Sequence, residues 1–425
     1  MKRRHFIVSA SAVGVATALG LRPSDNGAPY NAYFSALNKE FSRHGPHRPA
    51  IIVDLDRLDQ NINTLISLIR PSVGYRIVAK SLPSPSLLRY IMDTAKTHKL
   101  MLFHLPFIQH VAQEFPHSDI LLGKPMPVAA VEQFYIQHTQ VTSTFKPAIQ
   151  LQWLVDNTER LQQYLSLAQQ RQITLRINIE IDVGLHRGGI QKPDQLKQML
   201  ALTLAHPQHL TFSGLMGYDP HVVKIPSILD SEADAFRQSQ AIYQRFIDVI
   251  VNDFPQIDLS SLCLNGAGSP TVALHQQGSV VNEVSAGSCL VKPSDFDIPS
   301  LEGFVPASYI ATPVLKQSPG IRVPSVESLS PLLSWWDINQ QQTFFIYGGE
   351  WMAHYESPAG LQKNTLYGKS TNQQMVNGSN AVSLHVDDHV FLRPTQSEAV
   401  FLQFGDIVTL RQGSIQDHWS ILGND

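Results

Sequence analysis

The sequence predicts a parallel β/α barrel followed by a β-rich second domain, and three observations carry this prediction. Short apolar runs alternate with helical stretches between residues 48 and 300. After about residue 300 the helical periodicity disappears, and short alternating runs punctuated by Gly and Pro replace it. A doubly wound nucleotide-binding sheet has a Gly-x-Gly-x-x-Gly turn after its first strand, and this sequence has no such turn there. Eight or so strands separated by helices therefore indicate a closed (β/α)8 barrel of the TIM type.

The individual elements follow from apolar spacing and from turn residues. In the barrel region strands are expected at 50–53, 75–79, 100–103, 119–122, 149–155, 174–181, 212–216, 261–264 and 282–285. The intervening helices include 54–70, 158–171, 193–205 and 232–253. Later strands are expected at 310–315, 343–347, 382–385, 389–392 and 407–410. We thus expect a barrel over 48–300 and a β-rich domain over 301–425, which the extended segment 29–47 joins.

Composition narrows the class of protein. The chain has 425 residues, of which 43% are hydrophobic and 16% charged, as in a soluble globular protein with room for two cores. The net charge is −3 and no basic stretch follows the first few residues, so nucleic-acid binding has no electrostatic support. The two cysteines, Cys263 and Cys289, exclude a disulfide framework or a cysteine zinc cluster, and we expect two buried free thiols.

The first 28 residues are expected to form an export signal. Lys2-Arg3-Arg4-His5-Phe6-Ile7 precedes an uncharged run that ends at Leu21 and is too short and too rich in small residues for a permanent membrane anchor. This segment resembles a twin-arginine signal, because two arginines are followed by a spacer, Phe and an aliphatic residue. An ordinary secretory signal is the alternative. Cleavage is expected between Ala18 and Ala28, and the mature protein in the periplasm.

Lys80 is the strongest single candidate for covalent chemistry. It ends the predicted strand in Tyr75-Arg-Ile-Val-Ala-Lys80-Ser81. In β/α barrels the reactive groups lie at the carboxyl ends of the strands, where the βα loops form the pocket. A partly buried lysine loses its charge more easily than a surface one, and a neutral amine forms a Schiff base with an aldehyde. A solvated surface lysine is the alternative.

Six motifs in order resemble the fold-type III enzymes that depend on pyridoxal 5′-phosphate (PLP) and share the alanine racemase fold. The resemblance is closer to the branch of D-threonine aldolase and eukaryotic-type D-serine dehydratase. The motifs are Arg48-Pro-Ala-Ile-Ile-Val-Asp54 leading to Val-Ala-Lys80, Ile179-Glu-Ile-Asp182-Val-Gly184-Leu-His-Arg187-Gly-Gly189, Gly214-Leu-Met-Gly217-Tyr218-Asp-Pro-His221, Asn265-Gly266-Ala-Gly268-Ser269-Pro-Thr271, Glu283-Val-Ser-Ala-Gly287-Ser288 and Val386-Asp-Asp-His389-Val-Phe-Leu-Arg393-Pro394-Thr-Gln396-Ser-Glu398. The resemblance implies that Lys80 carries PLP.

Two of these motifs suit the phosphate and the ring of PLP. The glycines of Gly266-Ala-Gly268-Ser269 allow backbone N–H groups to approach an anion, and Ser269 adds a hydroxyl donor. The resemblance implies this phosphate role, and a tight structural loop is the alternative. In related enzymes the arginine corresponding to Arg187 lies near the pyridine ring, where it keeps the ring nitrogen unprotonated. An ion pair of Arg187 with Asp182 or Glu180 is the alternative.

Tyr218 and His221 end the next predicted strand and are candidate acid–base groups. Histidine titrates near neutrality and tyrosine near pH 10, so either side chain can hold or move a proton. The resemblance implies a hydroxyl facing the cofactor ring and an imidazole behind it or facing the substrate. A structural histidine is the alternative for His221.

The C-terminal motif departs from the relatives it resembles. There a Pro-x-His-x-Cys/Asp stretch holds a divalent metal beside the cofactor, whereas this chain has Gln396 and Glu398 at the two ligand positions. Oxygen ligands suit Mg²⁺, Mn²⁺ or Ca²⁺ better than Zn²⁺. Alternatively no metal binds, and the two side chains contact the substrate. Cys289 lies where relatives often have a tyrosine.

The expected function is that of a PLP-dependent lyase acting at the α-carbon of a D-amino acid. Retro-aldol cleavage or β-elimination of a D-3-hydroxy amino acid is the first expectation, and an amino-acid racemase is the alternative. A PLP-binding protein without turnover belongs to a different class and stays open. The resemblance implies a homodimer with a small-molecule substrate.

Overall fold

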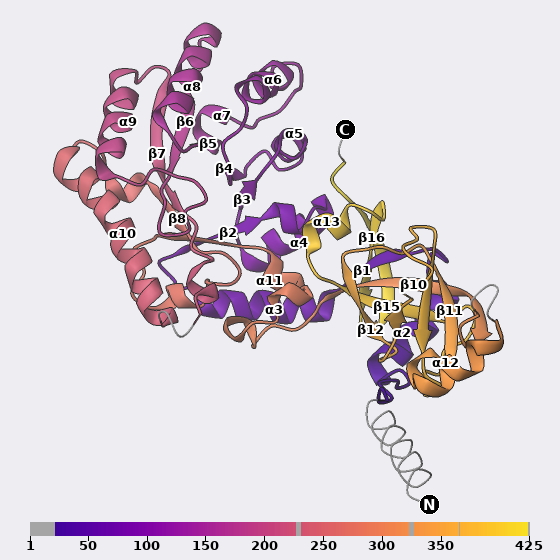
Figure 1. Ribbon diagram of the computed structural model, residues 1–425. Helices are drawn as coiled ribbons and strands as arrows, with labels where there is room; N and C mark the ends of the chain where they lie inside the picture. The colour runs from indigo at the N-terminus through magenta and orange to yellow at the C-terminus, as the bar shows by residue number, and fades with distance from the viewer. Residues whose placement is uncertain (1–21, 227–230, 323–326, 365, 424–425) are drawn as a thin grey trace, which may run out of the picture. The chain divides into compact units, whose positions relative to one another are not determined.

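The structure is a computed structural model that describes residues 22–226, 231–322, 327–364 and 366–423. These residues form two compact units (Figure 1). The barrel unit contains 55–307, 396–407 and the residues from 418 onward, and the sheet unit contains the described residues up to 54 together with 308–395 and 408–417. Residues 1–21, which hold most of the expected export signal, lie outside the described residues.

Eight parallel strands close the barrel and confirm the predicted fold class. They are β2 (Gly74–Val78), β3 (Lys99–Leu102), β4 (Asp119–Leu122), β5 (Leu151–Val155), β6 (Leu175–Glu180), β7 (Leu210–Gly217), β8 (Cys263–Gly266) and β9 (Glu283–Ala286). Closure occurs between β2 and β9, where Gly74 pairs with Glu283 and Ile77 with Ala286. The βα loops therefore meet at one end of the ring, where a β/α barrel builds its pocket.

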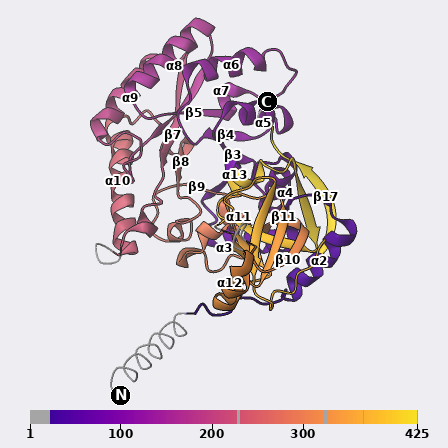
Figure 2. The same cartoon turned by 45° about the vertical axis from the view of Figure 1, so that its right-hand side comes forward.

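The barrel unit also contains helices, and the longer ones cover the outside of the barrel (Figures 1 and 2). The helices of this unit are α3 (Leu55–Leu68), α4 (Pro85–Ala95), α5 (Leu105–Glu114), α6 (Val128–His138), α7 (Pro147–Gln150), α8 (Thr158–Arg171), α9 (Pro193–Ala205), α10 (Glu232–Asp253), α11 (Ser288–Val291) and α13 (Ser397–Phe401). Side-chain caps fix two of the starts, because Asn157 accepts from the Arg160 N–H and Ser231 from the Asp234 N–H. The helices α8, α9 and α10 have the bounds that the sequence predicts.

Among its described residues the sheet unit contains an antiparallel sheet and two α-helices, and the last two strands of the sheet extend by two or three residues into the ranges of the barrel unit. Its elements are α2 (Ala32–His44), β1 (Ala50–Asp54), β10 (Ser308–Pro319), α12 (Ser330–Trp336), β11 (Gln342–Tyr347), β12 (Ala353–Ser357), β13 (Gln362–Lys363), β14 (Gln373–Gly378), β15 (His389–Pro394), β16 (Asp406–Arg411) and β17 (Ser414–Ser420). The strand order is β13-β14-β11-β10-β1-β16-β17, and β15 pairs with β10 and β12. Phe34 and Phe41 of α2 pack on Ile52, Tyr309 and Phe391 to form the core.

Four expectations about local structure differ from the fold. The run 50–53, expected to begin the barrel, is β1 and pairs antiparallel with β10, Ile51 opposite Ile310. A buried apolar run reads the same in either kind of sheet, so periodicity cannot assign it. Segment 29–47, expected to be extended, contains α2, which Asn31 caps. Residues 382–385, expected to be a strand, have no regular secondary structure, and α13 belongs to the barrel unit although it lies within 301–425.

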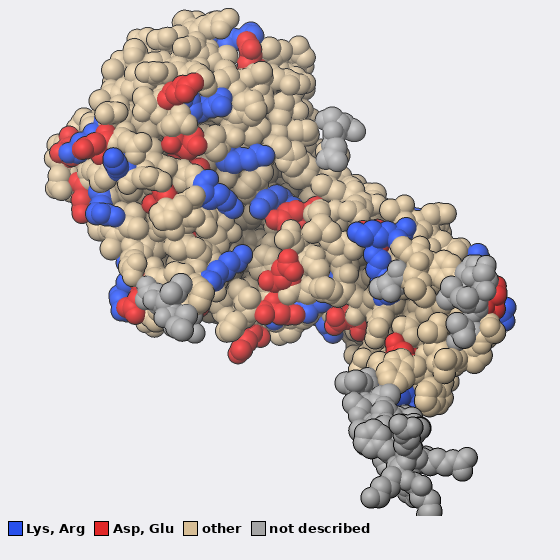
Figure 3. All heavy atoms as spheres, viewed as in Figure 1, with Lys and Arg blue, Asp and Glu red and all other residues tan. Residues whose placement is uncertain are grey.

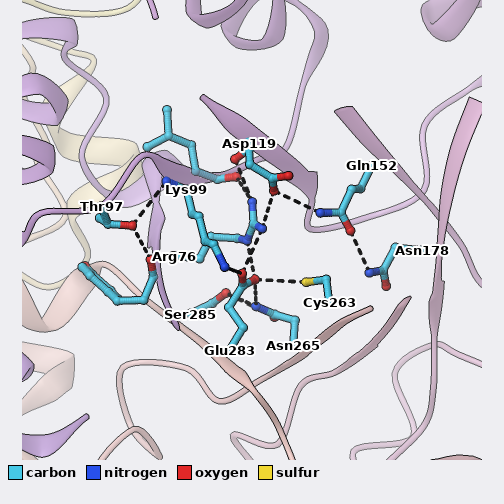
Figure 4. Close-up of polar contacts among 12 residues, drawn as sticks. Arg76, Thr97, Lys99, Asp119, Gln152, Asn178, Cys263, Asn265, Glu283 and Ser285 are labelled. Carbon is cyan, nitrogen blue, oxygen red and sulfur yellow. Dashed lines mark hydrogen bonds and ion pairs between the residues drawn. The ribbon is translucent and has the colours of Figure 1, made fainter. Parts of the chain in front are cut away.

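A buried charge network fills the barrel at the amino-terminal ends of its strands (Figure 4). Arg76 is 1% exposed, and its guanidinium binds Glu283 at 2.5 Å and Asp119 at 2.5 Å. Glu283 also accepts from Lys99 Nζ at 2.8 Å and from Asn265 Nδ2 at 2.8 Å. Because buried charges are tolerated only when paired and hydrogen-bonded, the network fixes five strands to one another. Sequence reasoning did not identify it.

Surface charge and hydropathy agree with the composition. On the face shown in Figure 3, acidic and basic side chains are interspersed over the barrel unit rather than gathered into a field of one sign. Among the helices of the described residues, none combines the length and the apolar character needed to cross a bilayer.

Candidate active site

Lys80 lies directly after β2, in a short 3₁₀ turn formed by Ala79–Ser81. Its Nζ is 3.1 Å from Oε1 of Glu398 and 4.9 Å from the centre of the Phe103 ring. The Lys80 side chain is 42% exposed and that of Glu398 is 32% exposed, so the pair lies at an opening rather than in the core. Glu398 comes from α13, which the chain inserts into the barrel unit after the sheet unit.

The Lys80 amine opens into a cavity at the carboxyl ends of the barrel strands. The cavity contains about 650 Å³ of space that is open to solvent. It is lined by the loop Ala267-Gly268-Ser269, by the hydroxyl residues Ser81 and Ser288, by Arg187, Tyr218 and Glu398, and by the apolar residues Met101, Phe103, Met216 and Phe296. Its mixture of apolar walls with a few polar groups suits a small ligand.

The loop after β8, which the sequence analysis expects to bind a phosphate, packs closely against neighbouring parts of the barrel. A Cβ on Gly268 would lie 2.5 Å from Cε2 of Tyr218, and a Cβ on Gly287 would lie 2.5 Å from the Val78 carbonyl oxygen, so both positions require glycine. Ser269 Oγ accepts from the N–H groups of Gly287 and Cys289, at 3.2 and 3.1 Å. These bonds tie the β8 and β9 loops together. A glycine loop that lines the cavity is compatible with the phosphate of PLP, because glycine allows the backbone to approach a ligand closely.

Two serines to which the sequence analysis gave no role complete this wall of the cavity. The hydroxyls of Ser81 and Ser288 are 2.9 Å apart, and both residues are buried. Ser81 follows Lys80, and Ser288 ends a motif quoted for the family resemblance, so adjacency to those motifs was the available signal. Both hydroxyls can donate to a phosphate oxygen.

Arg187 and Tyr218 lie together on another wall. The guanidinium carbon of Arg187 is 5.1 Å from the centre of the Tyr218 ring, a cation–π contact. Burial raises the pKa of the Tyr218 phenol, and the nearby Arg187 charge opposes this shift. Tyr218 therefore keeps its proton at neutral pH and is a donor rather than a base.

The ion pair considered for Arg187 with Asp182 does not form. Asp182 instead binds Nδ1 of His186 at 2.8 Å and accepts from the N–H groups of Gly184 and His186. Near Arg187 lies Glu180, whose pKa is raised to about 7 by burial, with Asp156 adding to the shift and Arg187 opposing it. A carboxyl that titrates near neutrality at the end of a barrel strand is unusual.

His221 is not among the residues that line the cavity. It packs behind the Gly184 turn, where a Cβ on Gly184 would lie 2.8 Å from its Nε2. Burial lowers the pKa of the His221 imidazole, and its Nδ1 has no hydrogen-bond partner among the described residues. The imidazole is therefore neutral at pH 7 and stands behind the wall that carries Arg187.

The two residues in the metal-ligand positions face different partners. Gln396 Nε2 donates to Asp295 Oδ2 at 3.2 Å, whereas Glu398 pairs with Lys80. Within the described ranges, no group of three or more His, Cys, Asp or Glu side chains is arranged to hold a metal ion. Both cysteines are free thiols, and burial raises the pKa of the Cys289 thiol to about 12. Cys263 is only half-buried and donates to Glu283.

The fold and the strand-end lysine define the class of protein, and comparison with known proteins agrees. The family model for the alanine racemase N-terminal domain matches residues 53–295, more than half of the chain, so the chain belongs to this fold-type III, PLP-dependent family.

Solved structures with the same architecture include enzymes of three named activities. The D-threonine aldolase from Filomicrobium marinum has a TM-score of 0.67 at 17% identity, and the match covers 88% of this chain and 94% of that one. The D-threo-3-hydroxyaspartate dehydratase from Delftia sp. HT23 has a TM-score of 0.65 at 17% identity, covering 89% and 98%. The alanine racemase of Clostridium difficile 630 has a TM-score of 0.65 at 15% identity, covering 88% and 98%. These identities show a shared fold only. A comparison with curated protein sequences gave no match.

Proposed function

We propose that the protein is a PLP-dependent lyase that acts at the α-carbon of a D-3-hydroxy amino acid. One observation carries the proposal: the Lys80 amine, the Gly268–Ser269 loop and the Glu398 carboxylate meet in one cavity. The first two fit a covalently held PLP. The third places a carboxylate beside the amine, at a position where the relatives named in the sequence analysis hold a metal ligand.

Each wall of the cavity has a part of PLP to hold. Lys80 would bond to the aldehyde carbon, and the loop 266–269 with Ser81 and Ser288 would bind the phosphate. Arg187 and Tyr218 would border the ring, where a fixed positive charge keeps the pyridine nitrogen from accepting a proton. When bound, PLP stabilises negative charge at the α-carbon of an amino acid attached to it.

The chain's own groups then supply proton transfer. When a substrate amine takes the place of Lys80 on the cofactor, the Lys80 amine would be free to take or return a proton at the α-carbon. In aldol cleavage Glu398 would accept the proton of the 3-hydroxyl while the bond between the α- and β-carbons breaks, releasing an aldehyde and leaving glycine. In β-elimination Lys80 would remove the α-proton, and the hydroxyl would leave as water with a proton from the Glu398 carboxyl.

Glu398 also bears on the metal. In the enzymes that the sequence resembles, a divalent ion activates the β-hydroxyl. Glu398, which lies beside the Lys80 amine, would instead accept the proton of that hydroxyl directly. We propose that Zn²⁺ is not required. A metal held by Gln396 and Glu398 would be Mg²⁺ or Mn²⁺, and Gln396 would first have to leave Asp295.

A racemase is the second candidate, and Tyr218 is the observation in its favour. Racemisation needs a base and an acid on opposite faces of the α-carbon. Tyr218 and Lys80 both line the cavity, and burial keeps the phenol protonated. A third candidate is a protein that binds PLP but catalyses no reaction. Conversion of any tested amino acid would exclude this candidate.

Location and assembly are proposals that rest on sequence and family. We propose export through a twin-arginine signal in residues 1–28, location in the periplasm, and a homodimer. Replacing Arg3 and Arg4 by lysine should retain the protein in the cytoplasm, and light scattering of the purified protein should give twice the chain mass.

The decisive test is covalent PLP on Lys80. Purified protein with PLP should show the visible absorption band of lysine-bound PLP, and borohydride reduction should fix a pyridoxyl phosphate mass on the peptide containing Lys80. Lys80→Ala should lose both signals, whereas Lys146→Ala, at an exposed lysine of the same unit, should keep them. Wild-type protein without the band or the mass would overturn the proposal.

Substrate assays then separate the reactions. D-threonine, D-serine and L-alanine are incubated with holoenzyme, with and without EDTA. Aldehyde with glycine indicates an aldolase, keto acid with ammonia a dehydratase, and inverted alanine a racemase. Loss of activity in EDTA would contradict the proposal that Glu398 acts without a metal.

A further inference from the structure

Behind the cavity, a buried network of side chains connects the loop after β8 to the residue that follows Tyr218. Asp219, Thr271 and His275 are 1%, 0% and 3% exposed. Asp219 Oδ1 accepts from Thr271 Oγ1 at 2.6 Å, and Asp219 Oδ2 binds His275 Nε2 at 2.8 Å. None of the three lines the cavity.

The direction of each bond follows from what the groups can donate. An ionised carboxylate only accepts, so Thr271 gives its single hydroxyl proton to Asp219 and His275 carries a proton on Nε2. The Thr271 oxygen is then free to accept, and it does so from the Gly268 N–H at 3.1 Å. At the far end His275 Nδ1 is 2.7 Å from Ser279 Oγ. Every polar atom of the Asp219 carboxylate is thereby occupied.

This network joins two walls of the cavity. One is the glycine loop, whose Gly268 faces the Tyr218 ring so closely that a Cβ there would lie 2.5 Å from it. The other is the end of β7, where Tyr218 and Asp219 are consecutive residues. The bond series Gly268 N–H, Thr271 O–H, Asp219 carboxylate therefore runs from one wall to the other through protein that excludes water.

We propose that Asp219 is a positioning residue that holds the phosphate loop in its binding conformation against Tyr218 before any ligand arrives. The inference rests on the proposed function, and it gives a role to Asp219 and Thr271, which the sequence motifs contain without assigning them one. A glycine loop has many backbone conformations to lose when it binds an anion. Fixing it in advance removes that loss from the binding step, which is how preorganisation raises affinity. Thr271 transmits the constraint, and His275 holds the second oxygen of Asp219.

An ordinary core network would stabilise the fold without affecting phosphate binding, and a matched pair of substitutions separates the two roles. Thr271→Val keeps the shape but removes the hydroxyl that bridges Gly268 and Asp219. Thr203→Val makes the same change at a residue that is 1% exposed in α9, where the hydroxyl donates to the Met199 carbonyl at 2.8 Å. Thr271→Ser restores the bridging hydroxyl.

For each variant we would measure the dissociation constants of PLP and of pyridoxal, which lacks the phosphate. The ³¹P chemical shift of bound PLP and the urea midpoint of unfolding of the apo protein are measured as well. Thr271→Val should weaken PLP at least about tenfold, a loss of about 1.4 kcal/mol, and move the ³¹P shift, while pyridoxal binding changes little. Thr271→Ser should keep the wild-type PLP affinity and ³¹P shift, because it retains the bridging hydroxyl. Thr203→Val should lower only the urea midpoint of unfolding.

Three results would count against the inference. Unchanged PLP affinity in Thr271→Val would overturn it while leaving the proposed function intact. Equal weakening of PLP and pyridoxal would also overturn it, because the effect would then not reach the phosphate. A wild-type protein that binds no PLP would overturn the inference and the proposed function together.

Discussion

Glu180 gives the sharpest prediction about pH, because the structure raises the pKa of its carboxyl from 4.5 to about 7. Burial at the end of β6 is the largest cause, the negative charge of Asp156 adds to it, and Arg187 opposes it. The folded protein therefore holds a proton at Glu180 at pH values where the unfolded chain has released it.

The sign and the size follow from linkage. Between pH 4.5 and 7 the folded state binds more protons at this site, so the free energy of unfolding falls as the pH rises. The contribution is complete below pH 4.5 and lost above pH 7. For these two pKa values, linkage gives a decrease of about 2.5 kcal/mol between pH 5 and pH 8. The carboxyl is only partly buried, so solvent screening reduces the expected change to about 1–2 kcal/mol.

Glu180→Gln removes this titration, and urea unfolding of the apo protein at pH 5 and pH 8 measures it. Between pH 5 and pH 8, the free energy of unfolding of the variant should rise by about 1–2 kcal/mol relative to that of wild type. Glu302→Gln, at an exposed position of the same unit, controls for loss of a carboxylate from the chain. The reasoning fails if Glu180→Gln and wild type keep a constant difference between the two pH values.

Two other substitutions test the barrel and the loop. Glu283→Gln removes one of the two carboxylates that bind the buried Arg76 charge at 2.5 Å, so the free energy of unfolding should fall by about 3–5 kcal/mol in urea denaturation; a change below about 1 kcal/mol would show that Asp119 alone compensates Arg76. Gly268→Ala places a Cβ 2.5 Å from the Tyr218 ring, so the ring or the loop must move and PLP affinity should fall about tenfold in equilibrium titration. Unchanged affinity would show that the loop tolerates the shift.

Local signals in the sequence were sufficient for much of the barrel. Helices α8, α9 and α10 have polar capping residues or a proline at their starts and apolar residues at helical spacing, and both features depend only on nearby residues. The strand 50–53 could not be assigned in this way. Whether a buried run pairs in a parallel barrel or in an antiparallel sheet depends on its distant partner, here β10, which lies more than 250 residues later in the chain.

In the candidate site, too, some features follow from local sequence signals and others depend on distant partners. Lys80, the 266–269 loop, Tyr218 and Arg187 come together because each follows a strand of one closed ring, so the strand order alone brings them together. Hydrogen-bond partners are different. Nothing local to Gln396 indicates that its amide faces Asp295, and nothing local to Glu283 indicates that it binds Arg76 and Lys99 from two other strands. Such pairings depend on which side chains meet in three dimensions.

The position of Glu398 in the chain bears on how the reaction is specified. The family match ends at residue 295, so it contains Lys80 and the 266–269 loop but not Glu398. The chain leaves the barrel unit at Ala307 and returns at Gln396 to place α13 beside Lys80. The part that fits PLP and the part that would act on the substrate's hydroxyl therefore lie in separate segments. A change at 396–398 can alter the chemistry beside Lys80 while the cofactor cradle stays the same.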